Sequence, residues 1–220
     1  YYSHRHRDFS SKKKQDLKLF FYQTNAVQKW LDSDMQLLLE MATGCGKTRT
    51  AIGCMQRLLS SCSKPVLVVI ACPQSTLSLQ WKKDIDGLST SVDASMICDG
   101  TVHNWRTELD KEVKKLASGF HKNLIVYTTH QTCSDEDFIS YINRCNRRIV
   151  KLFIGDEVHG MGAPKTRNGL LDCYQYRLGL SATPARWFDD EGSKLIEDYF
   201  GNNSFVFTIQ DALTTINPLT

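Results

Sequence analysis

The stretch Met41-Ala42-Thr43-Gly44-Cys45-Gly46-Lys47-Thr48 decides the fold of this 220-residue chain. It follows the apolar run Leu37-Leu38-Leu39 and precedes a segment whose apolar residues repeat with helical periodicity. A strand, a glycine-rich loop that ends in Gly-Lys-Thr, and a helix form the arrangement that binds the phosphates of a nucleoside triphosphate. Met41 replaces the first glycine of the usual phosphate-loop pattern, so an ordinary glycine-rich turn between a strand and a helix stays open as the alternative.

The residue types in this loop suit phosphate binding for separate physical reasons. Glycines allow backbone N–H groups to turn toward phosphate oxygens, and the first turn of a helix presents the positive end of its dipole to an anion. Lys47 would place a positive charge at the β- and γ-phosphates, and the hydroxyl of Thr48 would bind Mg²⁺. We therefore expect the nucleotide to contact Thr43, Gly44, Cys45, Gly46, Lys47, Thr48 and Arg49.

The composition is that of a globular and mildly basic protein. Hydrophobic residues make up 41% of the chain and charged residues 23%, and the net charge of +3 permits nucleic-acid binding without requiring it. The eight cysteines include no Cys-x-x-Cys pair, which favours reduced thiols and a cytoplasmic location over a zinc site or a disulfide framework. Apolar runs stay far below the roughly 20 residues that span a bilayer, and the polar N-terminus is unlike a signal peptide, so we expect no membrane association.

The chain divides into a polar N-terminal arm, residues 1–16, and one domain over residues 17–220. The arm carries basic clusters at 4–7 and 12–14; a solvated lead-in and a nucleic-acid contact are both open. Predicted strands cover 35–41, 66–72, 92–97, 124–127, 149–154 and 176–180, and predicted helices cover 25–31, 47–62, 75–85, 105–116 and 135–142. Strands that alternate with helices predict an α/β fold, with a mostly parallel central sheet and helices on both faces.

A second acidic element completes the predicted chemistry. The buried run at 151–155 leads into Asp156-Glu157-Val158-His159, and side chains at the carboxyl end of a parallel strand face the crevice in which ligands bind. Asp156 would hold Mg²⁺ through a water molecule, and Glu157 would orient or deprotonate the attacking water. The predicted catalytic residues are therefore Glu157, Lys47 and Asp156, whereas an exposed acidic turn is the alternative.

Three further polar residues are predicted to couple the nucleotide to neighbouring loops. His159 follows the acidic pair directly, and Ser181 and Thr183 lie in Gly179-Leu180-Ser181-Ala182-Thr183-Pro184, at the end of the last predicted strand. Their hydroxyls could bond to the acidic loop, although a strand that simply ends before a proline would show the same pattern.

These motifs, in this order, resemble motifs I, II and III of superfamily 2 helicases. The chain is more closely similar to the first RecA-like domain shared by the motor subunits of type I and type III restriction enzymes and by the repair helicase of a eukaryotic transcription factor complex. Further stretches agree: Leu19 to Val27 resembles the family's opening motif, 73–81 resembles motif Ia, 127–131 resembles a later nucleic-acid-facing motif, and the segments at 177–186, 189–192 and 199–201 resemble restriction-type helicases. The resemblance covers roughly residues 17–218.

The resemblance implies several residue roles. Gln23 would read the adenine of ATP, and nucleic acid would contact Pro73, Gln80, Thr128, Thr129 and Gln131. Two positions depart from the family: Phe20 replaces an arginine, so that arginine's contact is absent or replaced, and Cys45 stands where Thr or Ser is frequent. Trp81 fits equally well as a buried helix anchor and as part of the nucleic-acid motif.

The expected function is that of an ATP-binding, Mg²⁺-dependent motor domain of a DNA helicase or translocase of restriction or repair type, acting on double-stranded DNA. In the family a second RecA-like domain supplies an arginine finger, and none is found within these 220 residues, so we expect slow ATP hydrolysis by this chain alone. A regulatory ATP-binding module that docks nucleic acid without motor activity is the alternative. A small phosphate-loop kinase or GTPase fits less well, because no Asn-Lys-x-Asp guanine signature is present.

Overall fold

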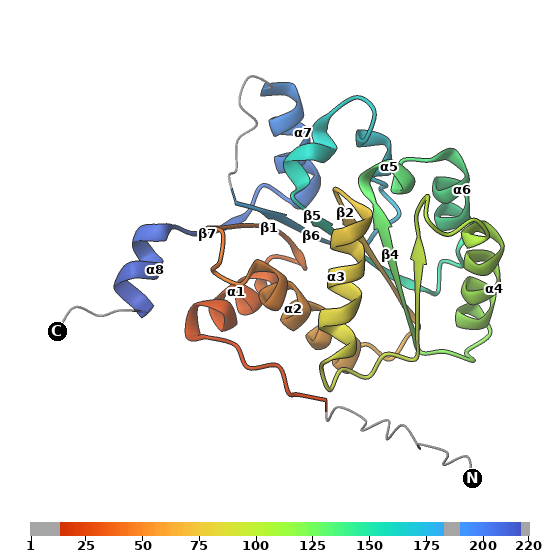
Figure 1. The fold of residues 1–220 in the computed structure, drawn as a ribbon, viewed down its shortest axis with the longest axis horizontal. Coiled ribbons are helices and arrows are strands. Elements are labelled where there is room, and N and C mark those ends of the chain that lie inside the picture. Colours follow the sequence, from red (N-terminus) through yellow and green to blue (C-terminus); the bar gives the residue numbers. More distant parts are fainter. Residues whose placement is uncertain (1–13, 183–189, 217–220) are drawn as a thin grey trace, which may run out of the picture.

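A computed structural model describes residues 14–182 and 190–216 of the chain. Its centre is a seven-stranded sheet in the order β3-β4-β2-β5-β6-β1-β7, and every strand pair in it is parallel. Helices cover both faces of this sheet (Figure 1). The predicted α/β class with a parallel sheet is confirmed.

The strands and helices follow one another along the chain in near-regular alternation. The strands are β1 (Gln36–Met41), β2 (Val66–Cys72), β3 (Ala94–Cys98), β4 (Asn123–Thr129), β5 (Val150–Asp156), β6 (Tyr176–Ser181) and β7 (Ser204–Phe207). The helices are α1 (Phe21–Asp32), α2 (Lys47–Ser61), α3 (Ser75–Asp86), α4 (Trp105–Ala117), α5 (His130–Cys133), α6 (Glu136–Arg144), α7 (Asp190–Phe200) and α8 (Ile209–Ile216), with 3-10 turns η1 (Val158–Gly162) and η2 (Arg167–Gly169).

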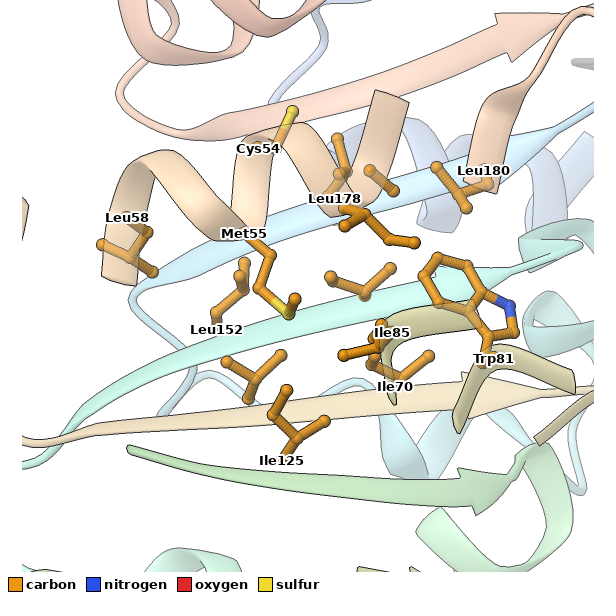
Figure 2. Packing of buried hydrophobic residues seen from close by; sticks show 14 of the residues in the cluster. Cys54, Met55, Leu58, Ile70, Trp81, Ile85, Ile125, Leu152, Leu178 and Leu180 are labelled. Carbon is orange, nitrogen blue, oxygen red and sulfur yellow. The ribbon is translucent and has the colours of Figure 1, made fainter. Parts of the chain in front are cut away.

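Side chains alternate between two hydrophobic cores, one on each face of the sheet. In β2, Val68 and Ile70 belong to the core beneath α1, α2 and α3, whereas Leu67 and Val69 belong to the core beneath α4, α6 and α7. Figure 2 shows the first core, where α2 and α3 pack against β2, β5 and β6. Because β2 is buried along its whole length, its sequence is a continuous apolar run with no polar face.

The predicted strands and helices agree with the observed ones in their central residues. They differ at the start of α1, at the edge of the sheet and at the N-terminal arm. The helix predicted from Asn25 begins instead at Phe21, because the Gln23 side chain accepts a hydrogen bond from the Phe20 N–H at 3.0 Å and caps the first turn. β7 pairs with β1 and extends the sheet at an edge that the sequence did not predict. The described part of the predicted arm, residues 14–16, contacts the domain through a bridge between Gln15 and Leu88, and residues 1–13 lie outside the described residues.

Parallel pairing places the carboxyl ends of all seven strands at one edge of the sheet. The glycine-rich loop follows β1 at this edge. Asp156 is the last residue of β5, and β6 lies between β5 and β1. Cys72 of β2 pairs with Thr129 of β4 at the same edge. The fold thus brings residues that are about 110 positions apart in the sequence to one rim.

Candidate functional site

The loop between β1 and α2 has the backbone of a phosphate cradle. Gly44 and Gly46 take left-handed φ angles of 85° and 79°, which side chains of L-residues rarely adopt. At Gly46 a Cβ atom would also collide with Gln23 Nε2, so a side chain there would displace the bonded Gln23 amide. Both glycines are therefore required by this loop conformation.

Helix α1 holds this loop from one side through two hydrogen bonds to the Cys45 carbonyl. Gln23 Nε2 donates to it at 3.1 Å, and the Tyr22 hydroxyl donates to it at 3.1 Å. Gln23 is almost fully buried, and its Oε1 accepts from the Phe20 N–H. The Tyr22 ring lies stacked between Phe20 and Phe207. Gln23, expected at the adenine, therefore lies directly against the loop, with both ends of its amide bonded to backbone groups.

The polar residues of the loop face different directions. The Lys47 ammonium donates to the Met41 carbonyl at 3.0 Å across the loop, and Thr48 is half-buried in the first turn of α2. Thr43 is exposed, whereas Arg49 donates to the Lys18 carbonyl at 2.9 Å, in the segment before α1. The Lys47 ammonium is thus held across the loop, while the Arg49 guanidinium points to Lys18.

Asp156 is held at two points. Its carboxylate Oδ2 accepts a hydrogen bond from Trp81 Nε1–H at 2.9 Å, and its backbone carbonyl lies 2.8 Å from His130 Nε2. Asp156 is 9% exposed. Burial lowers the pKa of His130 to about 4, so its ring is neutral at neutral pH. Both contacts come from segments that lie far from Asp156 in the sequence.

Glu157 has a strained backbone at the turn after β5. Its φ and ψ are 49° and 51°, in the left-handed region that residues other than glycine rarely occupy. His159 Nδ1 lies 3.4 Å from Glu157 Oε2, within ion-pair distance but without hydrogen-bond geometry. Strain of this kind concentrates at functional sites, which agrees with the catalytic role predicted for Glu157.

The remaining coupling candidates lie at the end of β6. Ser181 is buried and pairs with Glu40 of β1, next to Leu180, which pairs with Asp156. It therefore lies between the loop strand and the acidic strand. Thr183 lies outside the described residues.

The candidate nucleic-acid residues lie at the carboxyl ends of β2 and β4 and in the helices α3 and α5 that follow these strands. Pro73, Gln80 and Gln131 are exposed, and Gln80 donates to Asp84 one turn later. Thr129 caps α5 by accepting the Thr132 N–H. The fifth candidate, Thr128, is fully buried and its hydroxyl donates to the Cys98 carbonyl at 2.7 Å, so its side chain lies in the core.

The donor set at this rim suits Mg²⁺. The ion prefers oxygen ligands and keeps several waters, so a site with one carboxylate and one hydroxyl is sufficient beside a nucleotide phosphate. Asp156 supplies the carboxylate and Thr48 the hydroxyl. Among the described residues, the bond from Trp81 is the one hydrogen bond to the carboxylate, and it involves Oδ2 alone.

A cavity of about 780 Å³ lies away from this rim. It is lined by residues at the opposite ends of the strands, among them Lys64, Val66 and Asn123. None of the candidate site residues lines it. This cavity is therefore not part of the candidate site.

The comparisons with known proteins identify the family. Residues 16–186 match the family "Type III restriction enzyme, res subunit". The chain therefore belongs to this family, and its RecA-like helicase fold is the one expected from the motifs. No curated protein matches the sequence.

Solved structures share the fold at low sequence identity. The type ISP restriction-modification enzyme LlaBIII bound to DNA aligns with a TM-score of 0.68 at 18% identity, over 91% of this chain and 16% of its own. The Hef helicase domain of Pyrococcus furiosus aligns with a TM-score of 0.62 at 18% identity, over 86% of this chain and 38% of its own. The DEAD-box helicase Mss116, bound to single-stranded RNA and UDP-BeF, aligns with a TM-score of 0.62 at 19% identity, over 86% of this chain and 40% of its own. The chain thus spans less than half the length of each of these structures.

Sequence reasoning missed two residues of the site. It left Trp81 undecided between a core anchor and a nucleic-acid contact, and it gave His130 no role. The signal for Trp81 was its position one residue after Gln80 on an amphipathic helix, but the contact with Asp156 depends on how α3 lies over the sheet.

Within the described residues, no helix has the length and apolarity needed to cross a membrane.

Proposed function

We propose that this chain is the ATP-binding first RecA-like domain of a motor that couples ATP hydrolysis to movement on double-stranded DNA. The observation that carries the proposal is the convergence at one rim of the left-handed glycine loop after β1 and the Asp156-Glu157 pair after β5. The family to which the chain belongs supports the restriction-type assignment.

In this proposal each residue of the rim has a distinct task. The N–H groups of the loop and of the first turn of α2 bind the phosphates. Lys47 leaves the Met41 carbonyl and neutralises the β- and γ-phosphates. Thr48 and Asp156 hold Mg²⁺, which when bound neutralises charge on the phosphate oxygens. Glu157 accepts the proton of the attacking water.

Three further residues are proposed to recognise the base and report the state of the site. Gln23 contacts adenine, as the family resemblance implies, after its amide releases the bonds to the Phe20 N–H and the Cys45 carbonyl. His159 and Ser181 couple the acidic turn to neighbouring strands, supported by the short distance from His159 to Glu157 and by the place of Ser181 between β1 and β5. The same role for Thr183 stays a prediction from the sequence.

Nucleic acid is proposed to lie across the adjacent ends of β2 and β4. Pro73 and Thr129 lie at these ends, and Gln80 and Gln131 lie in the helices that follow; all but Thr129 are exposed. Polar residues and backbone N–H groups at such positions contact phosphates, so binding should not depend on base sequence. LlaBIII is bound to DNA and Mss116 to single-stranded RNA, so the choice of DNA as the polymer is supported by the restriction-enzyme family to which the chain belongs.

The test compares the wild-type chain with Lys47→Ala and Glu157→Gln. The wild type should bind a fluorescent ATP analogue in Mg²⁺, Lys47→Ala should bind it at least tenfold more weakly, and Glu157→Gln should bind it normally. Hydrolysis by the chain alone should be slow, because an arginine finger contributes about 10³–10⁵ in rate and would come from a second RecA-like domain. Equal nucleotide binding by wild type and Lys47→Ala would refute the proposed site. If residual hydrolysis is the same in Glu157→Gln, the regulatory module without motor activity becomes the better description.

A further inference from the structure

Trp81 is buried in the core but makes its polar contact with the candidate metal site. Its ring packs in the hydrophobic core beneath α3, near Leu180 and Ile70, and only 2% of the residue is exposed (Figure 2). The indole has a single polar group, the Nε1–H, which can only donate. This group donates to Asp156 Oδ2 at 2.9 Å.

The alternation of side chains along β5 explains why these two groups meet. Leu152 and Ile154 point into the core beneath α2 and α3, whereas Phe153 points into the opposite core. Asp156 continues the even-numbered series, so its carboxylate emerges on the face that α3 covers. Trp81 is the residue of α3 that reaches the end of this strand.

A hydrogen bond to one oxygen of a buried carboxylate restricts the orientation of that carboxylate. Bonds in which one partner is ionised are shorter and stronger than neutral ones. With Oδ2 bonded to the indole and the backbone carbonyl of Asp156 bonded to His130, the carboxylate has little freedom to rotate. A fixed carboxylate is what an octahedral ion with strict geometry requires.

We propose that Trp81 is a positioning residue for Mg²⁺: its indole N–H holds one oxygen of Asp156 so that the other faces the metal. This inference rests on the proposed function, because it assumes that Asp156 holds the ion. Trp81 also follows Gln80, a proposed nucleic-acid contact, so a displacement of α3 by the polymer would reach the carboxylate directly.

The test replaces Trp81 with Phe, which keeps an aromatic ring in the core and removes the donor. Nucleotide binding by the full chain is followed with a fluorescent ATP analogue while the Mg²⁺ concentration is varied. The concentration for half-maximal effect should rise about tenfold, equivalent to about 1.4 kcal/mol, while binding in EDTA stays unchanged. An unchanged or lower Mg²⁺ requirement would overturn the inference.

Trp30→Phe is the matched control. Trp30 is also fully buried, and its Nε1–H donates to the Arg177 carbonyl at 3.1 Å, at the far end of β6. It should lose comparable stability in urea unfolding without any change in the Mg²⁺ requirement, whereas an equal change in both variants would show that general loosening of the core is responsible.

Two further results keep the inference separable from the proposed function. If the wild type binds no nucleotide, or binds it equally with and without Mg²⁺, the proposed function fails and the inference falls with it. If Trp81→Phe does not fold, the ¹⁵N indole resonances of the wild type decide. Adding Mg²⁺ to the ATP complex should shift the Trp81 resonance and leave that of Trp30 unchanged; no shift at Trp81 overturns the inference.

Discussion

The left-handed backbone at Glu157 predicts that glycine is more stable than alanine at this position. An L-residue in this region costs about 1–2 kcal/mol because its Cβ approaches the following carbonyl oxygen. Glycine has no Cβ and avoids this cost, but it loses about 0.5–1 kcal/mol more conformational entropy on folding than alanine does. With φ of 49° and ψ of 51° at Glu157, the two effects leave Glu157→Gly more stable than Glu157→Ala by about 0.5–1 kcal/mol.

The comparison of two variants isolates the backbone from the side chain. Both remove the carboxylate and its proximity to His159 Nδ1, so those losses cancel. In urea unfolding the difference appears directly as free energy, and in a thermal scan it corresponds to about 1–4 °C for a domain of this size. Both variants should still bind Mg-ATP and should hydrolyse it more slowly than the wild type, because the proposed base is gone.

An exposed helical site provides the control. Lys111 lies within α4, where φ is negative and glycine has no steric advantage. Lys111→Gly should therefore be less stable than Lys111→Ala by about 1 kcal/mol. If Glu157 shows the same order as Lys111, the turn after β5 is not strained, and the argument from its left-handed backbone is refuted.

Three other outcomes are expected from the structure. Gln23→Ala should weaken ATP binding more than GTP binding, measured by competition with a fluorescent nucleotide; an equal loss would limit Gln23 to supporting the loop through its bond to Cys45. Ellman's reagent at pH 8 should modify the half-buried Cys62 and Cys173 first, because burial raises the pKa of Cys133 to about 12 and hides its thiol. In denaturant all eight thiols should react. Rapid reaction of Cys133 in the native protein would contradict its burial. The logarithm of the association constant for double-stranded DNA, measured by fluorescence anisotropy, should fall steeply and linearly with the logarithm of the salt concentration. An affinity that does not depend on salt would contradict the proposed phosphate contacts.

The sequence determined the strands and the loop because their signals are local. The apolar run of β2 predicted its bounds, since a strand buried on both faces has no other composition. The start of α1 was not predicted, because it depends on a side-chain bond from Gln23 to Phe20. β7 was not predicted either, since its four residues contribute one fully buried side chain, that of Phe207, and its pairing with β1 is a property of the whole sheet.

The candidate site divides in the same way between local and non-local information. Lys47, Asp156 and Glu157 carry recognisable motifs, and each lies next to an apolar run that predicts its strand. The left-handed conformation of Glu157 has no sequence signal, since glycine or asparagine would be the residues expected there.

Trp81 and His130 show where non-local information enters the function. Each is bonded to Asp156 across the fold, at sequence separations of 75 and 26 residues. Both come from the segments proposed to contact nucleic acid, α3 and α5, and both end on the residue proposed to hold Mg²⁺. A displacement of either segment therefore changes the position of one carboxylate, without any need for a longer chain of contacts. Under the proposed function these two hydrogen bonds would link the polymer to the nucleotide, and single substitutions at Trp81 and His130 test that link.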